Sequence, residues 1–111
     1  MAHYFTNDYA ISNERKIKIK FNNKEYTMFT ANNVFSKKSL DFGTRTLLES
    51  IDLSKLKGEI LDFGCGYGAI SIILATLVNA NIDGIDMNLR SLKLAEKNAL
   101  ENNVNVNFFE S

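Results

Sequence analysis

The sequence predicts an α/β fold in which an antiparallel β-hairpin precedes a parallel, doubly wound sheet. Three observations support this prediction. Residues 16–30 alternate apolar and polar side chains around a central pair of asparagines, and residues 59–109 alternate short apolar strands with amphipathic helices. A glycine cluster joins the first of these strands to the helix that follows it. Strands that alternate with helices over short connections normally pair in parallel.

Residues 16–21 and 24–30 predict the two strands of the hairpin. Asn22 and Asn23 lie between them, and asparagine tolerates the positive φ that a type I′ turn requires. The turn sets the pairs Ile19 with Tyr26, Ile17 with Met28, Lys20 with Glu25, and Lys18 with Thr27. One face of the hairpin is therefore apolar and the other is basic.

Residues 39–51 predict a helix. Its apolar positions are Leu40, Leu47, Leu48 and Ile51, and Ser39 or Asp41 is available as the N-cap. Gly43 inside this helix costs about 1 kcal/mol relative to alanine, which suggests that another group approaches closely there.

From residue 59 onward, strands and helices alternate. The strands are predicted at 59–63, 81–86 and 104–109. The first intervening helix has an apolar face formed by Ile70, Ile73, Leu74, Leu77 and Val78. The second helix, at 89–101, has Asn88 as its N-cap and a buried face formed by Leu92, Ala95 and Ala99.

The composition is that of an ordinary folded domain. Of the 111 residues, 45% are hydrophobic and 23% are charged, which excludes a disordered chain. No stretch approaches the roughly 20 apolar residues of a membrane helix, and no apolar block near the N-terminus suggests a secretory signal. The single cysteine excludes an internal disulfide and a zinc cluster. We therefore expect a cytoplasmic protein with no metal site and no membrane partner.

The net charge is zero but is unevenly distributed. Residues 1–40 carry seven Lys/Arg against three Asp/Glu, whereas residues 41–111 carry six against ten. A basic front end suggests contact with nucleic acid. The lysines available to contact phosphates are Lys16, Lys18, Lys20, Lys37 and Lys38. A solvated hairpin face explains the same lysines equally well.

The segment Leu61 to Ala69 is the most informative part of the chain, because it leaves a strand, passes three glycines and enters a helix. Glycines allow a tight turn and let a ligand touch the main chain. Asp86 follows Asp62 by 24 residues and ends the second strand. A carboxylate at that point can accept hydrogen bonds from both hydroxyls of a ribose. These features predict a cofactor that contains a nucleoside.

Two cofactor classes fit the glycines. Gly64, Gly66 and Ala69 satisfy the dinucleotide pattern, so a fragment of an NAD(P)-binding oxidoreductase is one alternative. Asp62, two residues before Gly64, favours the other class. Its carboxylate would repel a pyrophosphate, which binds at free helix-start N–H groups, and would suit the ammonium and sulfonium groups of S-adenosylmethionine. A hairpin and a helix before the first strand also differ from a dinucleotide fold, so S-adenosylmethionine is the predicted cofactor.

The same residues resemble a known family. The stretch Asp62-Phe63-Gly64-Cys65-Gly66-Tyr67-Gly68 resembles motif I of the class I methyltransferases. The preceding stretches resemble the segment before motif I in the small methyltransferase group: Val34-Phe35-Ser36, Leu40-Asp41-Phe42-Gly43-Thr44 and Leu47-Leu48-Glu49. That group includes bacterial enzymes that methylate the N2 amine of guanine in small-subunit ribosomal RNA. The resemblance extends from about residue 16 to the end of the chain.

This resemblance implies the N-terminal half of a Rossmann-like class I methyltransferase sheet, preceded by the hairpin. Residues 1–38 would form an N-terminal segment, and residues 39–111 a partial S-adenosylmethionine-binding domain. The substrate would be RNA. A non-catalytic RNA-binding module that uses the basic hairpin is a further alternative.

The resemblance also implies roles for site residues. Asp62, Gly64 and Gly66 would line the methionine side of the cofactor, Asp86 would hold the ribose, Met87 would pack on the adenine, and Phe35 and Ser36 would lie near the cofactor or the target base. Cys65 belongs to the same cofactor loop and is expected to be a small turn residue, since no histidine lies near it to activate it as a nucleophile. Tyr67 either contacts the cofactor or starts the helix.

Members of the family continue to a fourth strand that ends in an Asn-Pro-Pro motif, which holds the target amine. This sequence contains no proline and ends at Ser111. We therefore assign no catalytic residue and expect this chain to be inactive by itself. Strand 59–63 would also lack one neighbour, and its free edge would favour self-association.

Overall fold

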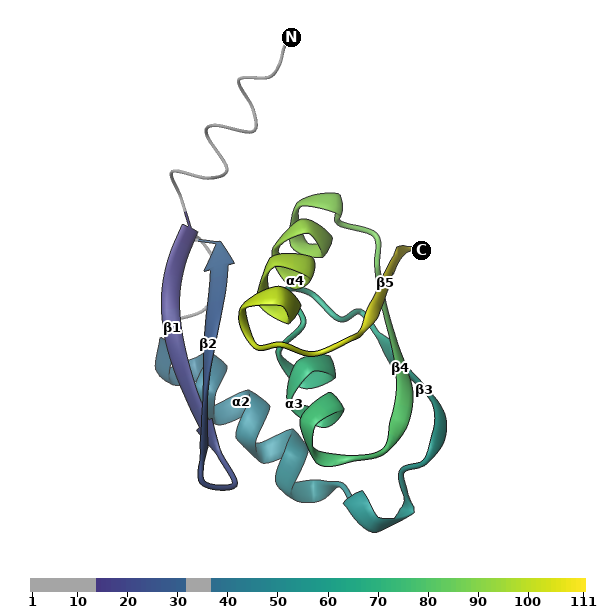
Figure 1. The fold of residues 1–111 in the computed structure, drawn as a ribbon. Helices are drawn as coiled ribbons and strands as arrows, with labels where there is room; N and C mark the ends of the chain where they lie inside the picture. Colours follow the sequence, from purple (N-terminus) through teal and green to yellow (C-terminus); the bar gives the residue numbers. More distant parts are fainter. Residues whose placement is uncertain (1–13, 32–36) are drawn as a thin grey trace, which may run out of the picture.

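The computed structural model describes residues 14–31 and 37–111. The elements in chain order are β1 (Glu14–Phe21), β2 (Lys24–Ala31), α2 (Lys37–Ser50), the 3-10 helix η1 (Leu53–Lys55), β3 (Gly58–Phe63), α3 (Ala69–Leu77), β4 (Ala80–Asp86), α4 (Leu89–Glu101) and β5 (Asn107–Glu110). The helices α3 and α4 lie between the hairpin on one side and the sheet β3-β4-β5 on the other (Figure 1). The predicted α/β architecture with a preceding hairpin is confirmed.

The hairpin has the predicted register. Ile19 pairs with Tyr26 and Lys20 pairs with Glu25, and the turn residues Asn22 and Asn23 have φ values of 56° and 65°. These are the positive angles that a type I′ turn requires. The inward side chains Ile17, Ile19, Tyr26 and Met28 are all buried. A local signal was sufficient here because the turn alone fixes which residues face each other.

Helix α2 begins earlier than predicted. It starts at Lys37, so Ser39 and Asp41 lie within the helix and the prediction that one of them caps it is wrong. Lysine has a good helix propensity, and Lys37 and Lys38 extend the helix toward the N-terminus. The close approach predicted at Gly43 is also not found, because no described atom lies within 4 Å of the position that its Cβ would take.

Helix α3 is buried on more sides than its predicted apolar face. Ile72 and Ile73 are both fully buried, whereas Val78 is the extended residue that ends the helix. Helix α3 is buried in this way because it lies in the middle layer, where it packs against the sheet on one side and against the hairpin on the other. On the hairpin side, the Tyr26 hydroxyl lies 2.6 Å from Thr76 Oγ1. A helix in this position needs apolar side chains around most of its circumference.

Helix α4 has the predicted bounds and cap. Asn88 accepts hydrogen bonds from the backbone N–H groups of Arg90 and Ser91. At the other end, Asn103 has a φ of 56°, and Val104 N donates to Ala99 O at 3.0 Å. This is a Schellman closure. Strand β5 begins at Asn107 rather than at the predicted residue 104, because Val104 takes part in closing the helix.

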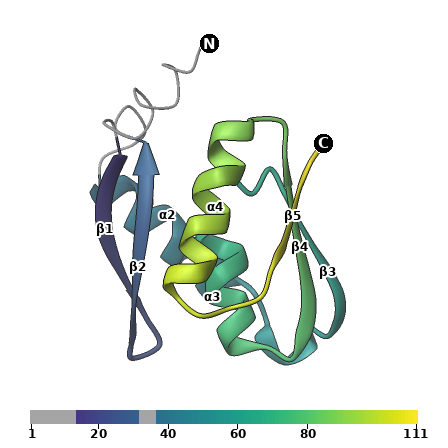
Figure 2. The ribbon, with the colours of Figure 1, turned by 45° about the horizontal axis from the view of Figure 1, so that its top comes forward.

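The sheet is parallel, in the order β3-β4-β5. Both α3 and α4 lie on the face toward the hairpin (Figures 1 and 2), so the described part of the chain has the helices of one face of the predicted sheet, and helices on both faces stay a prediction. Successive right-handed crossovers that step in one direction place their helices on one face. The opposite face carries Leu61, Phe63 and Phe109, which are 57%, 79% and 50% exposed. Within residues 14–31 and 37–111, the outer edge of β3 has no partner strand.

Candidate cofactor site

The predicted site residues gather at the carboxyl ends of β3 and β4. Parallel strands present these ends at the same edge of the sheet, where ligands of open α/β folds bind. Six of the predicted residues lie on or directly after these strand ends: Asp62, Gly64, Cys65, Gly66, Asp86 and Met87. The predictions for Phe35 and Ser36 fall outside the described residues.

The loop after β3 folds back over the end of β4. Gly64, Gly66 and Gly68 have φ values of 75°, 57° and 93°, which glycine adopts at no steric cost. The backbone N–H groups of Gly64 and Cys65 both donate to Ile85 O, at 2.8 and 2.9 Å. The glycines are therefore required by the path of the main chain, and the loop is anchored to the adjacent strand.

The carboxylate of Asp86 is held by two backbone donors. Its Oδ2 accepts from Gly66 N at 2.9 Å, and its Oδ1 accepts from Asn88 N at 2.9 Å. A carboxylate oxygen can accept more than one hydrogen bond, so each oxygen keeps capacity for a further donor. The structure thus adds an interaction that the sequence did not predict: Asp86 fixes the middle of the glycine loop.

Asp62 lies at the first turn of α3. Its Oδ2 accepts from Ser71 Oγ at 2.6 Å, and Ser71, the third residue of the helix, is fully buried. The carboxylate thus lies at the positive end of the helix dipole. A pyrophosphate bound to these helix-start N–H groups would approach this negative charge.

The pKa of the Cys65 thiol depends on the burial and the charges around the loop. Burial, together with the negative charges of Asp62 and Asp86, raises the pKa of its thiol from 9.0 to about 11. The thiol is therefore neutral near pH 7, which supports a structural role rather than a nucleophilic one. The same field favours a cationic ligand and disfavours an anionic one.

The space under the loop is closely packed. A Cβ added to Gly84 would lie 2.8 Å from Phe108 Cδ1 and 3.0 Å from Cys65 Cβ. Tyr67 is partly buried and packs against the core, whereas Met87, directly after Asp86, is 81% exposed. Met87 therefore presents an apolar side chain at the edge of the site.

Sequence reasoning missed three residues that shape the site: Ser71, Gly84 and Asn98. Ser71 is the only polar residue in the stretch 69–75, which was a usable signal for a contact with Asp62. Gly84 interrupts an otherwise regular strand, which can indicate a close approach. Asn98 is fully buried on α4 and donates from Nδ2 to Tyr67 O at 2.9 Å.

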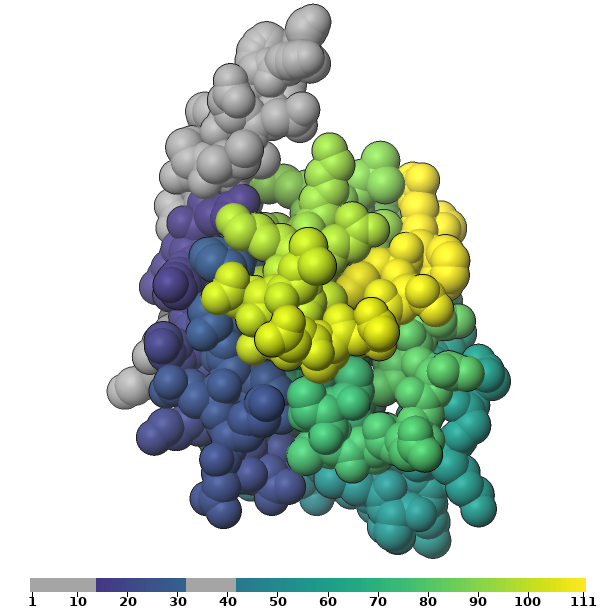
Figure 3. All heavy atoms as spheres, in the orientation of Figure 1, coloured from purple at the N-terminus to yellow at the C-terminus, as the bar shows by residue number. Residues whose placement is uncertain are grey.

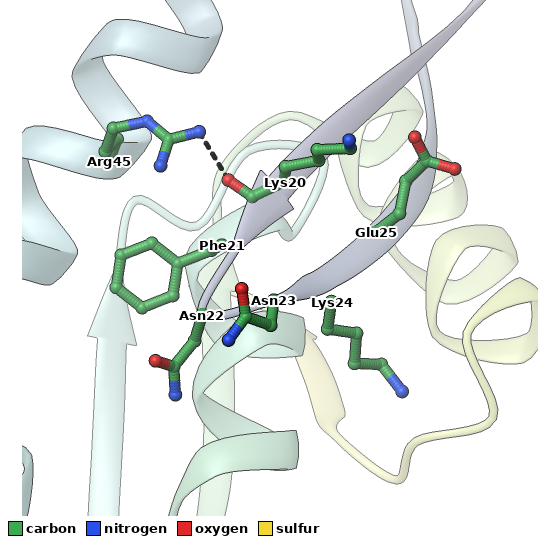
Figure 4. A pocket seen from close by; sticks show the side chains of 7 residues that line it. All are labelled: Lys20, Phe21, Asn22, Asn23, Lys24, Glu25 and Arg45. Atoms are coloured by element: carbon green, nitrogen blue, oxygen red, sulfur yellow. Dashed lines mark hydrogen bonds between the residues drawn. The ribbon is translucent and has the colours of Figure 1, made fainter.

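The hairpin carries a separate, basic surface. Lys16, Lys18 and Lys20 are exposed on the outer face of β1, and Lys18 Nζ lies 3.6 Å from Glu25 Oε1. Figure 4 shows a pocket at the hairpin tip, lined by Lys20, Phe21, Asn22, Asn23, Lys24, Glu25 and Arg45. The Arg45 guanidinium donates to the Lys20 carbonyl. The tip thus combines three cations with one carboxylate.

Comparison with known proteins gives one family and several relatives. The family model of the methyltransferase small domain matches residues 25–111. The uncharacterized protein YbxB of Bacillus subtilis (strain 168) is 38% identical over 112 residues, which cover 98% of this chain and 56% of that protein. The ribosomal RNA small subunit methyltransferase C of Haemophilus influenzae (strain 86-028NP) is 41% identical over 80 residues, which cover 71% of this chain and 24% of that protein. The chain thus spans about half the length of the first relative and a quarter of the second.

Solved structures show the same fold. The T. thermophilus 16S rRNA N2 G1207 methyltransferase, in complex with AdoMet and guanosine, aligns with a TM-score of 0.74 and 27% identity over 88% of this chain and 28% of that chain. The Pyrococcus abyssi tRNA (uracil-54, C5)-methyltransferase, in complex with S-adenosyl-L-homocysteine, aligns with a TM-score of 0.62 and 24% identity over 86% of this chain and 24% of that chain. The first likeness confirms the predicted Rossmann-like methyltransferase fold, and the second is a likeness of fold alone.

Proposed function

Because this chain belongs to the methyltransferase small domain family, we propose that it forms the S-adenosylmethionine-binding part of an RNA methyltransferase. The observation that carries the proposal is the pair of carboxylates, Asp62 and Asp86, on either side of the glycine loop. Together they make the surroundings of the loop negative, and their charges add to the effect of burial in raising the pKa of Cys65. S-adenosylmethionine carries an ammonium and a sulfonium, and this field suits both.

In this proposal, each part of the loop binds one part of the cofactor. Asp62, Gly64, Cys65 and Gly66 line the methionine side. Asp86 accepts from the ribose hydroxyls while it keeps its backbone contacts, and the exposed Met87 packs on the adenine. Phe35 and Ser36 contribute near the cofactor or the target base. When bound, S-adenosylmethionine supplies an activated methyl carbon, so the main task of these residues is to hold it in a fixed orientation.

The same geometry argues against a dinucleotide cofactor. A pyrophosphate is attracted to bare N–H groups at a helix start, but Asp62 lies over the first turn of α3 through its 2.6 Å hydrogen bond to Ser71. Two negative groups would then have to share a partly buried site. The oxidoreductase alternative is therefore disfavoured.

We propose ribosomal RNA as the substrate, and the N2 amine of a guanine as the atom that is methylated. The similar T. thermophilus protein is a 16S rRNA N2 G1207 methyltransferase with bound guanosine, and the hairpin of this chain offers exposed lysines for phosphates. We assign no described residue to hold the amine. An RNA substrate of this kind also implies a cytoplasmic protein, and none of the helices in the described ranges is long and apolar enough to span a membrane.

The free edge of β3 supports a proposal of self-association. An unpaired strand edge presents backbone N–H and C=O groups to another chain, and Leu61 and Phe63 on the same strand are exposed. Sedimentation velocity over a range of concentrations tests this. Dimers should form at high concentration, and a monomer at every concentration would contradict the proposal.

Calorimetric titration of the chain with S-adenosylmethionine and with NAD tests the proposed cofactor. We expect binding of S-adenosylmethionine alone, weakened by roughly 10- to 100-fold in Asp62→Asn and in Asp86→Asn, because each loses a charged hydrogen-bonding group. Asp83→Asn is the matched control. Its carboxylate lies on the same strand as Asp86 and accepts from Asn107 Nδ2 at 3.2 Å, so its loss should leave affinity unchanged. Tighter binding of NAD, or equal losses in all three variants, would overturn the proposal.

A further inference from the structure

We propose that Asn98 is a positioning residue that holds the glycine loop against the hairpin, so that the N-terminal hairpin is part of the cofactor-binding unit. The inference rests on the proposed function only in what it says about cofactor affinity. Its structural part rests on the contacts of one buried side chain.

Asn98 joins three elements with a single amide. Its Oδ1 accepts from Phe29 N on β2 at 2.7 Å, and its Nδ2 donates both to Phe29 O and to Tyr67 O, at 2.9 Å each. A side-chain amide has two N–H donors, so both are used, one on the hairpin and one on the glycine loop. Asn98 is fully buried. Losing these contacts would therefore leave buried polar groups unpaired, which costs free energy.

One turn later, at the C-cap of α4, Asn102 makes the same pair of contacts with the hairpin, and its side-chain hydrogen bonds do not include the loop. Its Oδ1 accepts from Thr27 N at 3.2 Å, and its Nδ2 donates to Thr27 O at 2.7 Å. Its second donor is directed to Asn98 O in the same helix, at 2.8 Å. Asn102 is therefore a natural control for the hairpin contacts of Asn98.

The two asparagines take the place of a strand along the free edge of β2. Residues four apart on a helix are separated by about 6 Å along its axis, and residues two apart on a strand by about 6.7 Å. This near match lets Asn98 and Asn102 reach Phe29 and Thr27 in turn. Helix α4 lies beside β2 in both ribbon views, and in the space-filling view its atoms lie between those of the hairpin and those of β5 (Figures 1, 2 and 3).

The contact with Tyr67 bears on the cofactor because of where it lies in the loop. Gly66 N is bound to Asp86 Oδ2 at 2.9 Å, and Gly68 N is bound to Cys65 O at 3.0 Å. The carbonyl between these two points is held by Asn98. Without that contact, the peptide between Tyr67 and Gly68 is held only through the hydrogen bond from Gly68 N to Cys65 O, so the loop is less ordered before a ligand binds. A loop that is held in advance binds its ligand more tightly.

The test compares Asn98→Ala with Asn102→Ala in the 111-residue chain. Both variants lose two hairpin contacts and should lower the midpoint of urea unfolding, and Asn98→Ala should lower it further because Asn98 is fully buried whereas Asn102 is partly buried. Only Asn98→Ala should speed amide hydrogen exchange at Gly66 and Gly68, by roughly tenfold relative to the exchange of β4 amides, because only it releases the loop. Calorimetry should show about a tenfold loss of S-adenosylmethionine affinity in Asn98→Ala and none in Asn102→Ala.

Equal loop exchange in the two variants would overturn the inference and leave Asn98 with a purely structural role. If Asn98→Ala does not fold, Asn98→Ser is measured instead, since its hydroxyl is too short to reach Tyr67 O but fills part of the space. Failure of the unaltered chain to bind S-adenosylmethionine would overturn the proposed function, whereas the exchange rates would still decide whether Asn98 positions the loop.

Discussion

The hairpin and the β3–β5 region differ in charge, in strand pairing and in the range of the interactions that define them. The hairpin, residues 14–31, carries five Lys/Arg against two Asp/Glu, whereas residues 58–111 carry three against seven. The first is an antiparallel pair closed by a local turn, and the second is a parallel sheet that needs its helices. The proposed function uses this contrast, with a polyanion at the hairpin and a cation at the loop, and α4 joins the two regions through Asn98 and Asn102. The division of the chain at residue 38 into two domains stays a prediction.

The two regions also treat their strand edges differently. The edge of β2 that faces α4 is satisfied by asparagine side chains, which bind the backbone of Thr27 and Phe29. The outer edge of β3 has no partner strand among the described elements. A satisfied edge resists pairing with another chain, whereas an open one invites it. Association should therefore occur at the sheet rather than at β2.

The largest effect should come from removing the hairpin charges. Combined Lys16→Ser, Lys18→Ser and Lys20→Ser should weaken binding of a guanine-containing RNA hairpin by roughly 10- to 100-fold. The salt slope should fall by about 0.7 to 0.9 for each phosphate that the variant no longer neutralises. Fluorescence anisotropy at several salt concentrations measures both quantities. Combined Lys55→Ser, Lys57→Ser and Lys93→Ser removes the same charge elsewhere. If the two triple variants lose equal affinity, the hairpin is not the RNA surface.

Two glycine substitutions compare the packing under the glycine loop with the packing around α2. Gly84→Ala should lower the free energy of unfolding by about 1–3 kcal/mol, because the added Cβ meets Phe108 and Cys65. Gly43→Ala should raise it by about 1 kcal/mol, because Gly43 is inside α2 and no other element among the described residues lies within 4 Å of the position of an added Cβ. Urea unfolding of each variant gives both numbers. A stabilising Gly84→Ala would contradict the close packing under the loop.

The smallest effect concerns the pH dependence of stability. The pKa of Cys65 is raised from 9.0 to about 11, so the stability gained from its neutral thiol is fully present below pH 9 and is lost as the pH rises through 11. The unaltered chain should therefore lose more stability than Cys65→Ala between pH 9 and 11, as measured by urea unfolding. Asp62→Asn should lower the pKa of the thiol, so the stability that is lost between pH 9 and 11 should be smaller in Asp62→Asn than in the unaltered chain. Identical pH profiles for the unaltered chain and Cys65→Ala would show that the thiol is not perturbed.

Short sequence patterns were sufficient to predict the features that depend on neighbouring residues, such as a turn or a helix cap. Asn22 and Asn23 were enough to predict the hairpin register, and Asn88 was enough to predict the start of α4. The one-sided placement of α3 and α4 was not predicted, because it depends on the order in which the strands assemble. The same holds for Asn98, whose partners Phe29 and Tyr67 lie 69 and 31 positions away in the chain. Its sequence context is that of an ordinary polar residue on a helix.

Amide chemical-shift mapping by NMR tests most directly whether the glycine loop binds S-adenosylmethionine. On titration with this cofactor, we predict shifts at residues 62–68 and 86–88, with the hairpin-tip amides of residues 20–25 unchanged. NAD at the same concentrations should leave the loop amides where they are. Shifts of the loop amides with NAD, or shifts with S-adenosylmethionine that are centred on the hairpin tip, would contradict the proposed cofactor site.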